Sequence, residues 1–339
     1  MSDGNGNLVQ LTGKDFKSDQ EVRWCPGCGD YAILNVVQGF MPELGLARER
    51  LVFVSGIGCA ARLPYYMQTY GMHSIHGRAP AIATGLAVTR PDLSVWVVTG
   101  DGDALSIGGN HLIHSLRRNV NLKILLFNNR IYGLTKGQYS PTSELGKVTK
   151  STPMGSLDYP FNPLSIAIGA EASFVARAID TDKKGLTEVL EAVARHRGSA
   201  FVEILQNFNI YNDGAFDYVR DEKSNRIYLE NGERIRFGAE SEKGVVQHAD
   251  GSAAVAAVAE VGEEALLVHD SGHREPSLAF ALSRITFETD GAVPLGVFRA
   301  VERPVYDDLM SEQLERARAQ SGEGDLAALL HSGDTWTVS

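Results

Sequence analysis

Two short apolar runs, separated by a turn rich in glycine and aspartate, constrain the fold more than any other part of the chain. The runs are SVWVVTG (94–100) and LKILLFNN (122–129), and the segment between them contains an amphipathic helix over 108–119. Continuous apolar runs rich in β-branched residues are typical of buried parallel strands. A strand, a helix and a second strand in succession predict one crossover unit of a parallel sheet.

Other segments continue this alternation. LVFVSGIG (51–58) and AFVEIL (200–205) are strand-like, GAEASFVARAI (169–179) is a further apolar segment, and helices are predicted over 79–90 and 185–197. We therefore expect an α/β fold in which a mostly parallel sheet carries helices on both faces.

Changes in the composition and pattern of the sequence divide the chain into three parts. Residues 1–20 are polar and are expected to form a mobile leader, and residues 21–215 hold the strand–helix pattern of the α/β domain. After about residue 215 the sequence becomes charged, and residues 216–339 are expected to form a C-terminal extension that covers the core or contacts a partner subunit.

The polar residues that end the two apolar runs indicate a metal site. Asp101 follows the first run and Asn129 ends the second, and in parallel sheets ligands bind beyond the carboxyl ends of the strands. A carboxylate, an amide oxygen and the backbone carbonyl of Ile131 supply three oxygens for Mg²⁺, and two diphosphate oxygens and a water complete an octahedron. The glycines of the turn let backbone N–H groups approach a phosphate.

A nicotinamide dinucleotide site is the weaker interpretation of the same turn. Its fingerprint needs G-x-G-x-x-G and an acid near the end of the next strand. GDGDAL lacks the third glycine, and the following run ends in asparagines.

The charge and the cysteines narrow the class of protein. A net charge of −10 argues against nucleic acid or an anionic membrane surface as a partner. No apolar run is long enough for a membrane span and the N-terminus has no signal-peptide core, so we expect a cytoplasmic protein. Three cysteines in 339 residues do not make a disulfide framework.

Five motifs, in this order, resemble those of the β subunits of 2-oxoacid:ferredoxin oxidoreductases. They are RWCPGCGDY, SGIGC, HSIHGRAPAIATGLA, GDGDALSIGGNH and NNRIYGLTKGQYSPT. The resemblance covers about residues 20–215, and GVFRAVERPVYDDLMSEQL near the C-terminus adds to it.

The resemblance implies a thiamine diphosphate-binding fold of the kind that holds the diphosphate half, with Asp101, Asn129 and the Ile131 carbonyl as Mg²⁺ ligands. It implies an α subunit that carries the pyrimidine half of the site, coenzyme A as a co-substrate, ferredoxin as the electron acceptor and an (αβ)₂ assembly. The β chain alone should be inactive.

His76, in H-G-R, is implied as a catalytic residue, although a lone histidine is more often a packed core residue. The residues implied to line the cofactor are Ile57, Gly58, Cys59, Ala60, His76, Gly100, Gly102, Asp103, Gly133 and Leu134.

The cysteine pattern alone leaves zinc, a redox dithiol or an iron–sulfur cluster open. The resemblance favours a [4Fe–4S] cluster bound by Cys25, Cys28, Cys59 and one late cysteine, but Phe208 occupies that last position. The fourth ligand is therefore unknown. Three outcomes stay open: ligation by a neighbour (Asn207, Asn209 or Asp213), ligation by a partner residue or water, or a three-iron cluster.

The loop GLTKGQYSPTS (133–143) favours 2-oxoglutarate as the substrate. Leu134 replaces a polar residue of pyruvate-using relatives, and Lys136 offers an ammonium for the second carboxylate of 2-oxoglutarate, although a loop lysine is usually only solvated. TPMGSLDYPFNPLSIAIGAEASFVAR (152–177) resembles 2-oxoglutarate enzymes of the group. The alternatives are a pyruvate or branched-chain 2-oxoacid oxidoreductase subunit, another thiamine enzyme, and a non-catalytic iron–sulfur or zinc-binding partner subunit.

Overall fold

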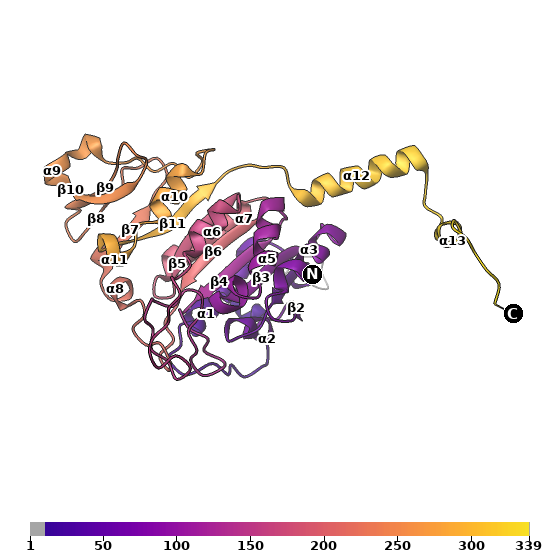
Figure 1. Cartoon of the computed structure of the whole chain (residues 1–339), viewed down its shortest axis with the longest axis horizontal. Helices are drawn as coiled ribbons and strands as arrows, with labels where there is room; N and C mark the ends of the chain where they lie inside the picture. Colours follow the sequence, from indigo (N-terminus) through magenta and orange to yellow (C-terminus); the bar gives the residue numbers. More distant parts are fainter. Residues whose placement is uncertain (1–10, 339) are drawn as a thin grey trace.

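The computed structural model describes residues 11–338 and has one large sheet at its centre (Figure 1). The sheet has eight strands in the order β2-β1-β3-β4-β6-β5-β11-β7. All strand pairs are parallel except β11 with β5, so β11 and β7 run against the others. The strands are β1 (Leu51–Ser55), β2 (Tyr70–His73), β3 (Ser94–Gly100), β4 (Lys123–Asn128), β5 (Phe174–Ile179), β6 (Ala200–Leu205), β7 (Arg226–Leu229) and β11 (Val293–Ala300).

Helices cover both faces of this sheet, as the sequence predicts. Successive residues of a strand point to opposite faces, and the two cores follow this alternation: Val95 and Val97 of β3 belong to one core, and Trp96 and Val98 to the other. The first core is closed by α3 (Ala79–Thr89), α5 (Gly109–Arg118), α6 (Pro163–Gly169) and α10 (Ser277–Ser283), and the second by α1 (Asp30–Phe40), α2 (Leu63–Tyr66) and α7 (Lys183–Arg195).

The chain beyond residue 215 contributes to the main sheet and also extends away from it. Its strands β7 and β11 join the eight-stranded sheet. A second, antiparallel sheet follows β7 and lies at one end of the molecule (Figure 1). The remaining elements are β8 (Arg236–Phe237), β9 (Lys243–Gln247), β10 (Ala253–Ala257), α8 (Asp217–Arg220), α9 (Val258–Val261) and α11 (Phe287–Asp290).

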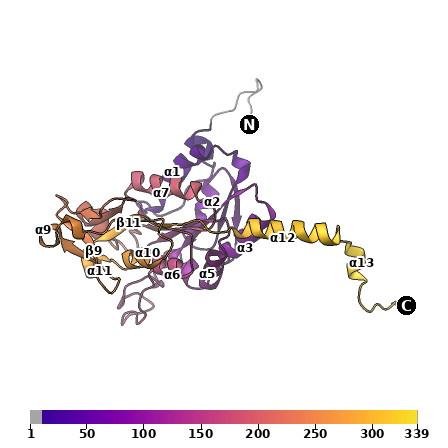
Figure 2. The same ribbon diagram turned by 90° about the horizontal axis from the view of Figure 1, so that it is seen from above.

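The last two helices, α12 (Tyr306–Ser321) and α13 (Leu326–Leu330), project from the body on the side opposite the small sheet (Figures 1 and 2). All residues from 311 to 338 are exposed. We call residues 306–338 the C-terminal arm. Among the described residues, no helix combines the length and the apolar character needed to cross a membrane.

The predicted mobile leader needs a correction over its described part. Residues 1–10 lie outside the described residues, but η1 (Gly13–Phe16) is packed on the body. Phe16 is fully buried in the core that α1 closes, and its carbonyl accepts a hydrogen bond of 2.9 Å from the Gln68 N–H. Leu11 also packs against this core, and the polar composition of the segment gave no indication of either contact.

The topology brings the carboxyl ends of β2, β1, β3, β4 and β6 to one edge of the sheet, as expected for parallel neighbours. The strands β3 and β4 pair directly, with Gly100 opposite Phe127. Asp101 and Asn129 therefore follow adjacent strands. The segment between β4 and α6, residues 129–162, contains no helix or strand and forms an irregular loop over this edge.

The opposite edge of the sheet is held by buried polar contacts around the end of α7. The His196 Nε2 lies 2.7 Å from the Ser173 Oγ, and the Lys123 ammonium donates a hydrogen bond to the His196 carbonyl. Burial, and then the charge of Lys123, lower the pKa of His196 to about 4.

This lowered pKa predicts a loss of stability in acid. The unfolded histidine takes up a proton as the pH falls below about 6.5, whereas the folded one stays neutral until about 4. Between these values the wild type should lose about 1–2 kcal/mol of unfolding free energy relative to His196→Gln, which has no proton to gain. Urea unfolding at pH 7.5 and pH 5 measures the difference. The control His248→Gln, at an exposed histidine, should lose as much stability as the wild type between the two pH values. The same loss in the wild type, His196→Gln and His248→Gln would contradict the role of His196.

Candidate active site

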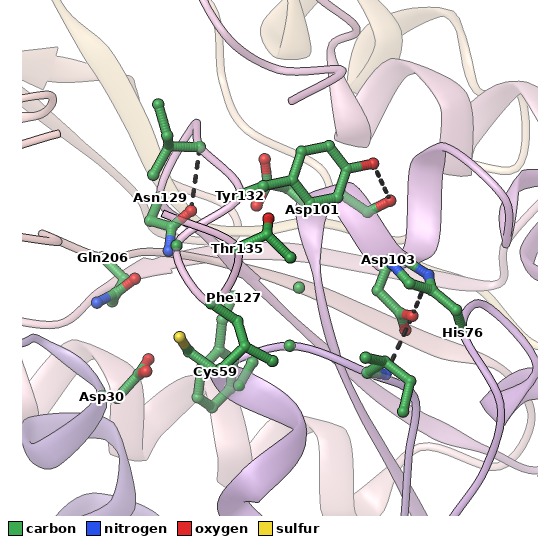
Figure 3. A pocket seen from close by; sticks show the side chains of 18 residues that line it. Asp30, Cys59, His76, Asp101, Asp103, Phe127, Asn129, Tyr132, Thr135 and Gln206 are labelled. Atoms are coloured by element: carbon green, nitrogen blue, oxygen red, sulfur yellow. Dashed lines mark hydrogen bonds and ion pairs between the residues drawn. The ribbon is translucent and has the colours of Figure 1, made fainter. Parts of the chain in front are cut away.

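A pocket opens at the carboxyl edge of the sheet, and segments far apart in the sequence form its walls (Figure 3). Every residue predicted to line the cofactor or to bind Mg²⁺ lies on it. The pocket is lined by Asp30, Ile57, Gly58, Cys59, Ala60, His76, Gly100, Asp101, Gly102, Asp103, Phe127, Asn129, Ile131, Tyr132, Gly133, Leu134, Thr135 and Gln206.

The Asp103 carboxylate joins three of these walls. Its Oδ1 accepts hydrogen bonds from the backbone N–H groups of Ile57 (3.1 Å) and Gly77 (2.7 Å), and its Oδ2 accepts one from the Thr99 hydroxyl (2.7 Å). The side chain is 2% exposed. Asp103 was predicted to line the cofactor, and the structure adds that its oxygens already hold the loops after β1 and β2.

His76 lies beside this carboxylate. Its Nδ1 is 2.8 Å from Asp103 Oδ1, and 37% of its side chain is exposed (Figure 3). Since Asp103 faces Nδ1, the second ring nitrogen, Nε2, is left for a bound molecule.

Asp101 is a buried carboxylate at the first position of the short helix α4 (Asp101–Leu105), which also carries Asp103. Its Oδ2 accepts hydrogen bonds from the hydroxyls of Ser140 (2.5 Å) and Thr142 (2.6 Å), which come from the long loop. Burial raises the pKa of Asp101 to about 6, although both hydroxyls oppose the shift. Among the described residues, no lysine, arginine or histidine pairs with this carboxylate.

The oxygen of Asn129 lies across the adjacent strand end. Its Oδ1 accepts a hydrogen bond of 3.1 Å from the Ile131 N–H, and the Asn212 amide donates one of 2.8 Å to the Asn129 carbonyl. These contacts fix the turn after β4, which carries the predicted Ile131 carbonyl.

Tyr132 closes the glycine turn from above. Its hydroxyl donates a hydrogen bond of 2.9 Å to the Gly102 carbonyl (Figure 3). A Cβ on Gly102 would lie 2.2 Å from the ring of Tyr132, so this position must be glycine for the ring to take its place.

A chain of buried polar side chains runs from the pocket across the middle of the sheet. Thr142 Oγ1 lies 3.0 Å from Asn128 Oδ1, and Asn128 Nδ2 donates a hydrogen bond of 2.7 Å to Glu203. The Arg177 Nε donates one of 2.7 Å to the other oxygen of Glu203, and both side chains of this ion pair are at least 92% buried. The position of Asp101 is therefore linked through Thr142 to β4, β6 and β5.

The cysteines gather at the far side of the pocket. Cys59 lines it, while Cys28 is buried beside Ile131 and Phe208, with Cys25 packed against this group. All three are free thiols. Burial raises the pKa of the Cys59 thiol to about 11 and also raises that of Cys28. Over residues 11–338, no three His, Cys, Asp or Glu side chains converge on a single metal ion.

Asp30 and Gln206 were not predicted, yet both line the pocket beside Cys59 (Figure 3). Burial raises the pKa of Asp30 to about 7, and the nearby Cys28 thiol opposes this shift. A signal existed for each: Asp30 ends the CPGCGD motif, and Gln206 directly follows β6 at the ligand-binding edge.

Lys136 does not line this pocket. It lies on the neighbouring turn with an exposed side chain and a left-handed backbone at φ 76°. The structure therefore places it beside Thr135, which lines the pocket, and its backbone N–H donates a hydrogen bond of 3.1 Å to the Gly133 carbonyl.

The sequence of the chain is similar to those of known proteins. Residues 56–204 match the family model described as "Thiamine pyrophosphate enzyme, C-terminal TPP binding domain". The chain is 64% identical over 330 residues to the 2-oxoglutarate oxidoreductase subunit KorB of Mycobacterium tuberculosis, covering 96% of this chain and 88% of the relative. It is 39% identical over 213 residues to the 2-oxoglutarate synthase subunit KorB of Methanocaldococcus jannaschii, covering 61% and 78%.

A solved structure agrees over almost the whole chain. It is the 2-oxoglutarate:ferredoxin oxidoreductase from Magnetococcus marinus with 2-oxoglutarate, coenzyme A and succinyl-CoA bound. The TM-score is 0.78 at 33% sequence identity, and the match covers 97% of this chain and 98% of the other.

The buried chain behind Asp101 predicts a large effect of Glu203→Gln. The glutamine amide keeps the shape of the side chain but leaves the Arg177 charge without its buried partner, which should lower the free energy of unfolding by about 3 kcal/mol. The control Glu188→Gln removes an exposed pair with Lys184 and should cost less than about 0.5 kcal/mol. Chemical denaturation measures both losses of unfolding free energy. Equal losses would show that the buried ion pair contributes no more to stability than the exposed one.

Proposed function

The chain belongs to the family of 2-oxoglutarate:ferredoxin oxidoreductase β subunits, and from this premise we propose how its pocket serves the reaction. The enzyme decarboxylates 2-oxoglutarate oxidatively to succinyl-CoA and CO₂, with ferredoxin as the electron acceptor. The observation that carries the proposal is the placement of Asp101 and Asn129 at the ends of two paired parallel strands, on one pocket.

Asp101, Asn129 and the Ile131 carbonyl would hold Mg²⁺, which would bind the diphosphate of thiamine diphosphate. The donor set fits a hard cation because all three ligands are oxygens. The buried, unpaired carboxylate of Asp101 also fits, since a divalent cation would compensate the cost of burying it. Ser140 and Thr142 orient that carboxylate, and Tyr132 fixes the glycine turn beneath the cofactor.

When bound, thiamine diphosphate supplies the carbanion-stabilising chemistry of decarboxylation. The chain's own residues position the substrate and the protons. His76 would present Nε2 to the substrate, because Asp103 faces the other nitrogen; the protonated ring would donate a hydrogen bond or a proton there, and the neutral ring would accept one. Leu134 and Ile57 would exclude water from the reacting side of the pocket.

Cys25, Cys28 and Cys59 would supply thiolate ligands to an iron–sulfur cluster, which accepts electrons one at a time. The chemistry of these donors fits such a cluster: three free thiols lie near one another and near the pocket. A four-iron cluster takes one terminal ligand on each iron, so its ligands surround the cluster and do not converge on one ion. The Gln206 Nε2 donates a hydrogen bond of 2.9 Å to Cys28 Sγ and would stabilise its thiolate.

The remaining parts of the site belong to other molecules. An α subunit would supply the pyrimidine half of the thiamine site, ferredoxin would remove the electrons, and coenzyme A would take the acyl group. An (αβ)₂ assembly is the arrangement we propose, because a site shared between unlike subunits is commonly repeated by two-fold symmetry.

Anaerobic co-purification with the α subunit tests the function. We expect bound thiamine diphosphate and iron, and reduction of ferredoxin that requires 2-oxoglutarate and coenzyme A together. The β chain alone should give no turnover. Turnover with pyruvate but not with 2-oxoglutarate would favour the pyruvate oxidoreductase alternative, and iron without thiamine would favour a non-catalytic subunit.

Thr142→Val tests the Mg²⁺ ligand arrangement. The valine keeps the shape but removes the hydroxyl that orients Asp101, so the affinity for Mg²⁺ should fall by about 10–100-fold. Titration of the αβ complex with Mg²⁺ in the presence of thiamine diphosphate measures it. Thr187→Val, on the exposed face of α7, should leave the affinity unchanged, and the same result for Thr142→Val would argue against Asp101 as a ligand.

Lys136→Ala tests substrate choice. We propose that the rim ammonium binds the distal carboxylate of 2-oxoglutarate, so the variant should raise the KM for 2-oxoglutarate about tenfold or more and hardly change that for pyruvate. Alanine keeps the Cβ at this left-handed position, so the backbone strain is unchanged. The control Lys150→Ala removes an exposed charge from the same loop. Equal effects on both substrates would contradict the role.

A further inference from the structure

Asp30 has an unusual combination of burial and unmet bonding. It is the first residue of α1 and is 1% exposed, and its Oδ1 has no hydrogen-bond partner. A buried carboxylate oxygen without a donor is costly and calls for a bound group. The side chain lines the pocket on the same side as Cys59 (Figure 3).

Two of the three thiols lie near this carboxylate. Cys28 is two residues before Asp30, and the negative charge of Asp30 is close enough to raise the pKa of both Cys28 and Cys59. Asp30 therefore lies near two of the three proposed cluster ligands, and it lines the same pocket as one of them, Cys59.

The position at which the resemblance places a fourth cysteine holds Phe208. Its ring is 2% exposed and packs on Cys28 and Ile131, and it would touch a Cβ at Gly133 at 2.8 Å. A phenyl ring has no donor for iron, so a three-thiol cluster needs its last ligand from elsewhere.

We propose that the Asp30 carboxylate is the fourth terminal ligand of the iron–sulfur cluster. The inference rests on the cluster assigned in the proposed function. Ligation forms one Fe–O bond from the carboxylate, in place of the solvent or carrier ligand that the fourth iron brings, and changes no oxidation state. Asp30 thereby connects the cluster to the pocket that holds the reacting cofactor.

Other nearby groups fit this role less well. Asn207 donates to Asp213 (2.8 Å) and accepts from the Gly214 N–H (3.0 Å), so these side chains already bind each other. Asn209 donates to the Pro26 carbonyl, and Asn209 and Gln206 each keep a buried oxygen without a partner. Both are neutral amides, which bind iron more weakly than a carboxylate does.

The test is ⁵⁷Fe Mössbauer and EPR spectroscopy of the anaerobic αβ complex, with iron and thiamine contents measured on the same samples. The wild type should hold four irons per αβ, with one iron spectroscopically distinct from the other three. Asp30→Asn should hold three irons and show the EPR signal of an oxidised three-iron cluster. The double variant Asp30→Asn/Phe208→Cys should regain four irons, which separates loss of a ligand from misfolding.

Asn209→Ala is the matched control and should keep the wild-type spectrum. Four irons with an unchanged spectrum in Asp30→Asn would overturn the ligand assignment and leave the function intact. Three irons in the wild type would also overturn it, because no fourth ligand then acts. A wild type with thiamine but no iron would overturn the cluster itself, and thus the electron transfer of the proposed function.

Discussion

The burial of one carboxylate, that of Asp103, sets the shape of the site. Removing a carboxylate from water costs several kcal/mol unless donors replace the lost hydration. Here the donors come from separate segments: the N–H groups of Ile57 and Gly77, and the hydroxyl of Thr99. The loops after β1 and β2 must therefore stay close to the turn after β3. Cys59 and His76 keep their places relative to Asp101 for this reason.

The same physical rule extends from the pocket into the sheet. Asp101 is oriented by hydroxyls of the long loop, and Thr142 links it to Asn128, Glu203 and the Arg177 charge. Each side chain of this hydrogen-bonded series has its partner on another strand or loop. These hydrogen bonds fix the position of Asp101 relative to the sheet, although most residues that line the site come from irregular segments.

The sequence predicts the parallel core well, because apolar runs and helical periodicity are local signals. The pairing of β3 with β4, and thus the approach of Asp101 to Asn129, follows from the rule for carboxyl ends. The packing of Phe16, the path that keeps Lys136 out of the pocket and the unmet hydrogen bonding of Asp30 could not be predicted. Each depends on contacts between distant segments, or on the path of a loop that no periodicity describes.

The C-terminal arm has a mechanical consequence. It follows β11, which lies inside the sheet between β5 and β7, and its root is held to the body: the Asp307 carboxylate accepts a hydrogen bond of 3.1 Å from the Asn121 N–H. A force on the arm therefore loads this root first, and next the half of β11 that pairs with β5 (Gly296–Ala300), before it reaches the half that pairs with β7 (Val293–Gly296). Tension on the arm is thus borne by the contacts at its root before it reaches the centre of the sheet.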